Sequence, residues 1–266
     1  EYAPRYLLQG HRVRRRVLQD LPQEIMRAYN LGFISDQDIF DHVRATVLLY
    51  RRNINLQEFN KNIVDPIKLT FDAGIYGKSI SDIVEAECVR QIDKSNTNHI
   101  GYFHQNLFKL VGGGWTVPST GFDIVNEDKH IFVELKNKHN TMNSSSAQQT
   151  YLRMQNKLLK DDQAICILVE VIARKSCDEV WEVGGFKHNR IRRMSIDRFY
   201  ELVFGNSDAF CSLCKALPLV LEDVLQTLGS TGIQNTVYND LKKLSPDIFQ
   251  SLYRLAFGTY NGFSDF

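Results

Sequence analysis

Residues 122–136 read FDIVNEDKHIFVELK, and apolar and polar side chains alternate through much of this stretch. A period of two is typical of β-strands, whose successive side chains point to opposite faces of a sheet. We therefore predict a strand over 122–125, a turn over 126–129 and a second strand over 130–136. The two strands would form a β-hairpin, and the rest of the fold is placed around it.

The second strand of this hairpin has one apolar and one charged face. Alternation puts Ile131, Val133 and Leu135 on the side that we expect to face the core. Glu134 and Lys136 then project together from the opposite side.

An acidic side chain of the first strand is expected to join them. Asp123 lies between two apolar residues, and a hairpin of this length can place it opposite Glu134. Two neighbouring carboxylates repel each other unless a cation lies between them, and Mg²⁺ prefers oxygen ligands. Lys136 could orient or help to deprotonate a water molecule that attacks a phosphodiester. The three side chains predict a magnesium-dependent hydrolytic site, and a cross-strand ion pair on a solvated sheet face is the alternative with the same spacing.

The segments around the hairpin are predicted from the same two periodicities. Apolar residues recur at helical spacing on both sides of it, and two short apolar runs follow it as strands. We predict helices over 35–50, 60–71 with an interruption near Pro66, 79–93, 147–158 and most of the chain from 196, and strands over 164–171 and 179–183. Strands enclosed by helices indicate an α/β fold with a mixed central β-sheet flanked by helices.

Composition limits the class of protein. The 266 residues are 43% hydrophobic and 24% charged, which is typical of a globular protein and not of a disordered one. No apolar run is long enough to span a membrane, so we expect no membrane partner. A formal charge of +1 excludes a polycationic surface but leaves room for a local basic cleft. Five cysteines fit a reduced cytoplasmic protein better than a disulfide framework.

The first 30 residues differ from the rest of the chain. They contain the basic group Arg12, Arg14, Arg15 and Arg16 among apolar residues. We interpret residues 1–30 as a basic N-terminal extension or arm, and a solvated helix face is the alternative. Residues 31–266 are predicted to form a single domain with a catalytic core at about 79–195.

One carboxylate of the predicted helix 79–93 lies on its apolar side. At 100° per residue, Glu87 falls among Ile83, Val84 and Cys88. Burying an unpaired carboxylate costs several kcal/mol. Glu87 is therefore expected either to meet a basic partner or to point into a polar site.

A resemblance gives these residues a chemical context. Gly121-Phe122-Asp123, ten intervening residues and Glu134-Leu135-Lys136 resemble the catalytic core of the PD-(D/E)xK nuclease superfamily. The wider runs VELKNKHNTMN at 133–143 and IGYFHQ at 100–105 resemble a family of type II restriction endonucleases that cut at GGNCC. The similarity extends from about residue 31 to the C-terminus. Phe122 replaces the proline of the superfamily name, at a position that supplies no ligand.

The resemblance implies roles for particular residues. Asp123 and Glu134 would bind the metal, the Leu135 carbonyl would be a third ligand, and Lys136 would be the catalytic lysine. Many members of the superfamily also use an acidic residue from an upstream helix, and the position of Glu87 nominates it for that role. The resemblance further implies a homodimer on a two-fold symmetric DNA site, with no nucleotide cofactor.

Candidate DNA contacts lie in two basic or polar segments. The predicted loop 137–146 follows the charged strand, and the segment 187–193 is the strongest basic cluster of the core. A solvated loop, helix capping by Asn143 and a solvated basic edge are the alternatives. The candidates are Lys138, His139, Asn140, Asn143, Gln148, Arg190, Arg192 and Arg193.

The leading hypothesis is a Mg²⁺-dependent, sequence-specific endonuclease for double-stranded DNA, of restriction type, that leaves 5′-phosphate and 3′-hydroxyl ends. One alternative keeps the nuclease core but assigns it to DNA repair or recombination, where DNA structure is recognised. The other alternative is a non-catalytic DNA-binding protein, in which Asp123, Glu134 and Lys136 form an ordinary ion-pair cluster.

Overall fold

The structure is a computed structural model that describes residues 27–139, 141–229 and 232–259. Most of the predicted basic arm, including the group Arg12, Arg14, Arg15 and Arg16, and the candidate DNA contact Asn140 lie outside these residues. In the described part of the chain, no helix is long and apolar enough to cross a membrane.

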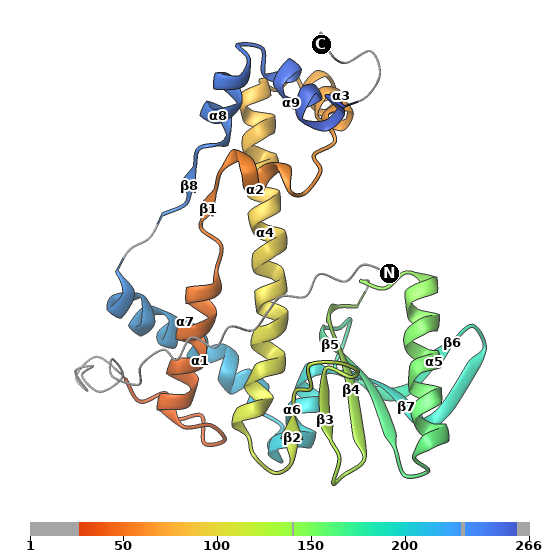
Figure 1. Cartoon of the computed structure of the whole chain (residues 1–266). Helices are drawn as coiled ribbons and strands as arrows, with labels where there is room; N and C mark the ends of the chain where they lie inside the picture. The colour runs from red at the N-terminus through yellow and green to blue at the C-terminus, as the bar shows by residue number, and fades with distance from the viewer. Residues whose placement is uncertain (1–26, 140, 230–231, 260–266) are drawn as a thin grey trace.

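A mixed six-stranded β-sheet forms the centre of the larger half of the molecule (Figure 1). Three neighbouring strands, β4, β5 and β7, are parallel, and antiparallel strands complete both edges. The strand order is β2 (Trp115–Thr116), β3 (Ile124–Asn126), β4 (Ile131–Lys138), β5 (Ile165–Ile172), β7 (Phe186–Ser195) and β6 (Asp178–Val183). The predicted hairpin is confirmed as β3 and β4, in which Ile124 is paired with Val133.

Helices cover both faces of this sheet, which confirms the α/β prediction. On one face, Val133 and Leu135 of β4 pack into a cluster with residues of four helices. These helices are α1 (Asp36–Leu49), the end of α4 (Ile80–Leu107), α6 (Ile196–Phe204) and α7 (Ala209–Leu228). On the other face, Phe132 packs against Tyr151 and Met154 of α5 (Ser144–Lys160). Both faces of β4 are therefore buried, and Glu134 and Lys136 project on the α5 side.

A third apolar cluster lies away from the sheet, around the first half of α4 (Figure 1). We call this part the helical lobe. It consists of β1 (Asn53–Ile54), α2 (Leu56–Asn60), α3 (Pro66–Tyr76), the start of α4, β8 (Gln234–Asn235), α8 (Val237–Leu244) and α9 (Ile248–Phe257). The parallel pair β1 and β8 joins the two segments of the chain that build the lobe.

Several predicted boundaries differ from the structure. Pro66 does not interrupt a helix but begins α3, where Asp65 caps the first turn and the missing N–H of proline costs no hydrogen bond. The helix predicted over 79–93 continues to Leu107, because Phe103 and Leu107 pack into the sheet cluster beyond a polar stretch. Strand β7 was not predicted, since its basic residues obscure the alternation.

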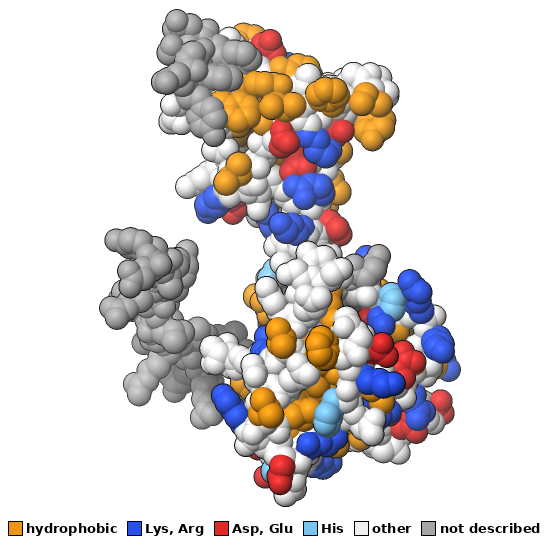
Figure 2. Space-filling model, turned by 90° about the vertical axis from the view of Figure 1, so that its right-hand side faces the viewer, with side chains coloured by type: hydrophobic (Ala, Val, Ile, Leu, Met, Phe, Trp, Pro, Cys, Tyr) orange, Lys and Arg blue, Asp and Glu red, His pale blue; other side chains and the backbone are white. Residues whose placement is uncertain are grey.

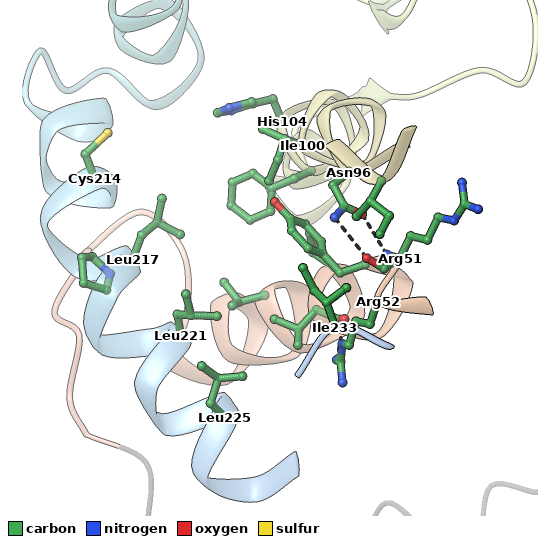
Figure 3. A pocket seen from close by; sticks show the side chains of 17 residues that line it. Arg51, Arg52, Asn96, Ile100, His104, Cys214, Leu217, Leu221, Leu225 and Ile233 are labelled. Atoms are coloured by element: carbon green, nitrogen blue, oxygen red, sulfur yellow. Dashed lines mark hydrogen bonds between the residues drawn. The ribbon is translucent and has the colours of Figure 1, made fainter. Parts of the chain in front are cut away.

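An apolar groove of about 770 Å³ lies between α1, α4 and α7 (Figure 3). Leu217, Leu221 and Leu225 line its α7 side, and hydrogen bonds between Asn96 and the Arg51 backbone lie on the opposite side. None of the candidate catalytic, metal or DNA-binding residues lines this groove.

His104 of α4 makes stability depend on pH. Burial and the nearby His42 lower the pKa of His104 to about 4 from 6.5, and its Nδ1 has no partner among the described residues. Unfolded chains bind this proton at a higher pH than folded ones, so stability is lost as pH falls from 6.5 towards 4. We expect His104→Phe to reduce this loss by roughly 1 kcal/mol per pH unit in urea unfolding between pH 6.5 and 4.5.

The control for this measurement is His188→Phe, at an exposed position of β7. It should unfold with the pH dependence of the unsubstituted protein. Equal slopes in all three proteins would contradict the assignment to His104.

Candidate active site

Asp123 lies directly before β3 and is fixed by two backbone groups of β4. Its N–H donates to the Val133 carbonyl (2.9 Å), and its Oδ2 accepts from the Leu135 N–H (2.8 Å). The β3–β4 pairing ends at Ile124 and Val133, and these two bonds hold Asp123 against the backbone of β4, close enough to Glu134 for the two charges to interact.

Glu134 is only 6% exposed and has two basic partners. Lys136 Nζ donates to its Oε1 (2.7 Å), and Arg153 Nη2 of α5 donates to its Oε2. The structure thus brings Asp123, Glu134 and Lys136 together. It also adds Arg153, which the sequence analysis missed although it flanks the apolar stripe of α5.

The electrostatics of the pair fit a divalent cation. Burial, and then the charge of Glu134, raise the pKa of Asp123, while the Leu135 N–H, Lys136 and Arg153 oppose the shift. Carboxylate oxygens that repel each other are a donor set for a hard cation. No group of three or more His, Cys, Asp or Glu side chains with metal-site geometry occurs in the described residues. The remaining ligands would have to be backbone carbonyls and water molecules.

We expect Asp123→Asn to stabilise the protein when EDTA is present. A raised pKa means that the ionised carboxylate, which dominates at neutral pH, is less favourable in the folded than in the unfolded chain. Asparagine keeps an oxygen acceptor for the Leu135 N–H but carries no charge. The gain in the free energy of unfolding should be largest at pH 7–8 and should shrink towards pH 3.8, the ordinary pKa of aspartate.

The matched control is Asp162→Asn, an exposed position after α5. It should leave the urea midpoint unchanged within error. An Asp123→Asn variant that is less stable than the unsubstituted protein at every pH would contradict the expectation.

The prediction that Glu87 is an acidic ligand of this site is wrong. Glu87 lies in the helical lobe, about 30 Å along α4 from Leu107, where the helix meets the sheet. Its carboxylate accepts two hydrogen bonds from Arg90 (both 2.6 Å) and one from Gln91 (3.0 Å). The basic partner that the sequence analysis gave as the alternative is therefore Arg90, one turn further along the same helix.

A second polar cluster lies on the same sheet face, next to Lys136. Glu170 of β5 is paired with Lys136 in the parallel register and is 1% exposed. Its Oε2 is 3.0 Å from His139 Nδ1, and its Oε1 accepts from Arg193 Nη2 (2.5 Å). A cavity of about 430 Å³ adjoins the three side chains, with Gln148 of α5 in its wall.

The candidate DNA contacts of the loop after β4 are divided by the structure. Lys138 and Gln148 are exposed, and His139 is half-buried against Glu170. Asn143 is the N-cap of α5, where its Oδ1 accepts from the Ser146 N–H (2.8 Å). Its side chain thus has the capping role that was the alternative to base contact.

The basic segment 187–193 does not form one surface, so that prediction is wrong. Alternation along β7 puts Arg193 on the α5 face of the sheet and Arg192 on the opposite face. Arg192 pairs with Asp178 (2.7 Å), and Arg190, near the other end of the parallel strands, donates to the Asp162 carbonyl. Only Arg193 therefore shares a face and an edge with Lys136.

One face of the molecule fits a local site better than an extended basic one. Figure 2 shows Lys and Arg side chains interspersed with Asp and Glu on the face turned to the viewer. This pattern agrees with the formal charge of +1.

Comparisons with known proteins place this arrangement in a family context. A model of the Eco47II restriction endonuclease family matches residues 31–226. The type II restriction enzyme Sau96I of Staphylococcus aureus is 34% identical over 233 residues, which are 80% of this chain and 89% of that protein. The type II restriction enzyme Eco47II of Escherichia coli is 30% identical over 220 residues, which are 76% of this chain and 91% of that protein. The family match contains all six strands of the central sheet.

Proposed function

The chain belongs to the Eco47II restriction endonuclease family, and from this premise we propose that it cuts both strands of DNA at a GGNCC-type site with Mg²⁺ as cofactor. The products would carry 5′-phosphate and 3′-hydroxyl ends. The observation that supports the proposed chemistry is the grouping of Asp123, Glu134 and Lys136 across one hairpin.

The family implies a divalent metal, and the carboxylates of Asp123 and Glu134 are the side chains that would hold it. The carbonyl of Leu135, whose N–H is hydrogen-bonded to Asp123, is the proposed backbone ligand. When bound, Mg²⁺ would neutralise charge on the scissile phosphate. Mg²⁺ is proposed over softer metals because the donors are all oxygen.

Lys136 is the proposed catalytic base or water-orienting group. Its Nζ lies 2.7 Å from Glu134 Oε1 and its side chain is 29% exposed, so a phosphate or a water molecule can reach it. An ammonium at this position would also stabilise negative charge that develops on the phosphate. Arg153, on the other oxygen of Glu134, holds that carboxylate in place and contributes a second positive charge.

DNA would lie across the carboxyl ends of the parallel strands β4, β5 and β7, where the charged side chains of the α5 face are found. Lys138, His139, Gln148 and Arg193 are the described candidates that lie near this edge. A two-fold symmetric DNA site favours a homodimer, in which each copy cuts one strand. We include the helical lobe in the same nuclease domain, since α4 runs through both parts.

We propose a cytoplasmic location for the enzyme. All five cysteines fall in the described residues and none is paired in a disulfide. Free cysteines are typical of a reducing compartment.

Digestion of a sequenced plasmid with Mg²⁺ tests the proposed function directly. Discrete fragments whose ends share a GGNCC motif, absent with EDTA, are the expected result. Nicking that follows DNA structure and not sequence would support the repair alternative. DNA binding without any cleavage would support the non-catalytic alternative and reduce the hairpin residues to an ion-pair cluster.

A further inference from the structure

We propose that Glu170 is a positioning residue that holds Arg193 and His139 as a binding site for one DNA phosphate next to the scissile one. This inference rests on the proposed function, because it assumes that the α5 face at the carboxyl ends of the strands receives DNA. It adds Glu170 and a specific pocket to the proposed hydrolytic residues.

Burial sets Glu170 apart from a surface carboxylate. Its side chain is 2% exposed, whereas those of His139 and Arg193 are 24% and 22% exposed. Burying a carboxylate is costly unless charged or hydrogen-bonding partners compensate, and both oxygens of Glu170 have such a partner. The carboxylate is thus sealed behind two basic side chains that still reach solvent.

The two basic side chains come from different parts of the sheet. His139 follows β4, and its backbone N–H donates to the Ile172 carbonyl at the end of β5 (3.0 Å). Arg193 lies near the end of β7, paired with Leu168 of β5. Arg193 Nη2 also contacts the His139 ring directly, and Glu170, on the strand between them, contacts both side chains and holds them beside Lys136.

Proximity to Lys136 connects this cluster to the chemistry. Lys136 and Glu170 are register partners on neighbouring parallel strands, which lie about 4.8 Å apart, and their side chains share a face. A DNA strand with its scissile phosphate at Lys136 would bring an adjacent phosphate to the cluster.

The cavity beside the cluster has the polar lining that a phosphate requires. Ser144 and Gln148, in the first turns of α5, line it together with His139 and Arg193. The 17-residue helix α5 directs its N-terminal end, with its partial positive charge, to this cavity. Glu182 of β6 also lines the cavity, and its charge would disfavour an anion in direct contact with it. One guanidinium nitrogen of Arg193, Nη2, contacts both Glu170 and His139, which leaves the N–H groups of Nε and Nη1 for a phosphate oxygen.

A phosphate scan tests the proposal. The probes are duplexes that carry the mapped cleavage site, each with a single neutral methylphosphonate at one backbone position, and binding is measured by fluorescence anisotropy with Ca²⁺ in place of Mg²⁺. We expect one position beside the scissile phosphate to weaken binding of the unsubstituted protein about tenfold. In Arg193→Met the unmodified duplex should bind about tenfold more weakly, and the same methylphosphonate should then have no further effect.

Two further variants and a matched control separate positioning from folding. In Glu170→Gln, the contribution of that same phosphate to binding should be partly lost. In Arg193→Met, the slope of log Kd against log salt should fall by about 0.9. The double variant Glu170→Gln with Arg193→Met buries no unpaired charge, so it remains informative if the single Glu170 variant does not fold. Arg192→Met, the neighbouring arginine on the opposite sheet face, should keep the full scan of the unsubstituted protein.

The result that overturns the proposal is an Arg193→Met variant whose scan and salt slope equal those of the unsubstituted protein. A loss confined to one base pair, with no phosphate effect, would equally overturn it. If the proposed function itself is wrong, the result is different, because the unsubstituted protein would then cut DNA at no specific site. The salt slopes on a duplex of arbitrary sequence would still test the phosphate contact.

Discussion

Lys136→Ala lowers the rate of DNA cleavage by about 10³-fold and leaves DNA affinity close to that of the unsubstituted protein: this is the largest effect that we expect. The side chain of Lys136 is hydrogen-bonded to Glu134 and otherwise partly open to solvent, so its loss removes a proton-transfer and charge-stabilising group without opening the core. Removal of one such group from a hydrolytic site commonly costs two to four orders of magnitude in rate, of which we adopt the middle.

Single-turnover cleavage at saturating enzyme isolates this chemical step, and anisotropy with Ca²⁺ reports affinity. Lys160→Ala, in the exposed last turn of α5, is the control and should cut at the unsubstituted rate. A Lys136→Ala variant that retained more than about a tenth of the rate would remove the lysine from the mechanism.

Phe108→Ala lowers the free energy of unfolding by about 3–5 kcal/mol, the largest stability effect that we expect. Phe108 is fully buried where α4 ends, and its ring packs against Phe199, Tyr200 and Phe204 of α6 (ring centroids 4.9, 5.3 and 6.2 Å). Alanine would lose the transfer free energy of the ring and leave a cavity that rigid neighbours cannot close.

Urea unfolding measures this loss through the midpoint at constant slope. Phe71→Ala, at a 63% exposed position of α3, is the matched control and should change stability by less than about 0.5 kcal/mol. Equal losses in the two variants would show that the contacts at the junction of α4 and α6 do not stabilise the fold.

The sequence predicts this site well where the pattern is local. The alternation of Val133, Glu134, Leu135 and Lys136 assigns each side chain to a face without knowledge of any distant residue. The turn that follows Asn126 then brings Asp123 back to β4, and in the structure Asp123 is hydrogen-bonded to the backbone of Val133 and Leu135, on either side of Glu134.

The sequence does not predict which side chains pair when they are far apart in the chain. Helical spacing places Glu87 on the apolar side of its helix, but spacing alone cannot distinguish Arg90 from a remote site as the partner of this carboxylate. Glu170 shows the converse: a carboxylate near the end of the apolar run 164–171 was a usable signal, but its partners His139 and Arg193 lie 31 and 23 residues away. Strand β7 could not be predicted for a related reason. Ile191 and Met194 are buried by neighbouring elements, and the basic composition of the strand does not indicate that burial.

The helical lobe contains segments that precede the central sheet in the sequence and segments that follow it. The order of synthesis therefore decides when the lobe can form. Strands β2 to β7 and helices α5 and α6 are complete before α8 and α9 leave the ribosome, although α2 and α3 were made first. Domains commonly begin to fold during synthesis, as soon as their residues are available. The N-terminal part of the lobe must therefore wait, with Ile83 and Val84 lacking their final partners, while the sheet that carries the hydrolytic residues can already assemble. Helices α8 and α9 then complete the lobe that α2, α3 and the start of α4 began.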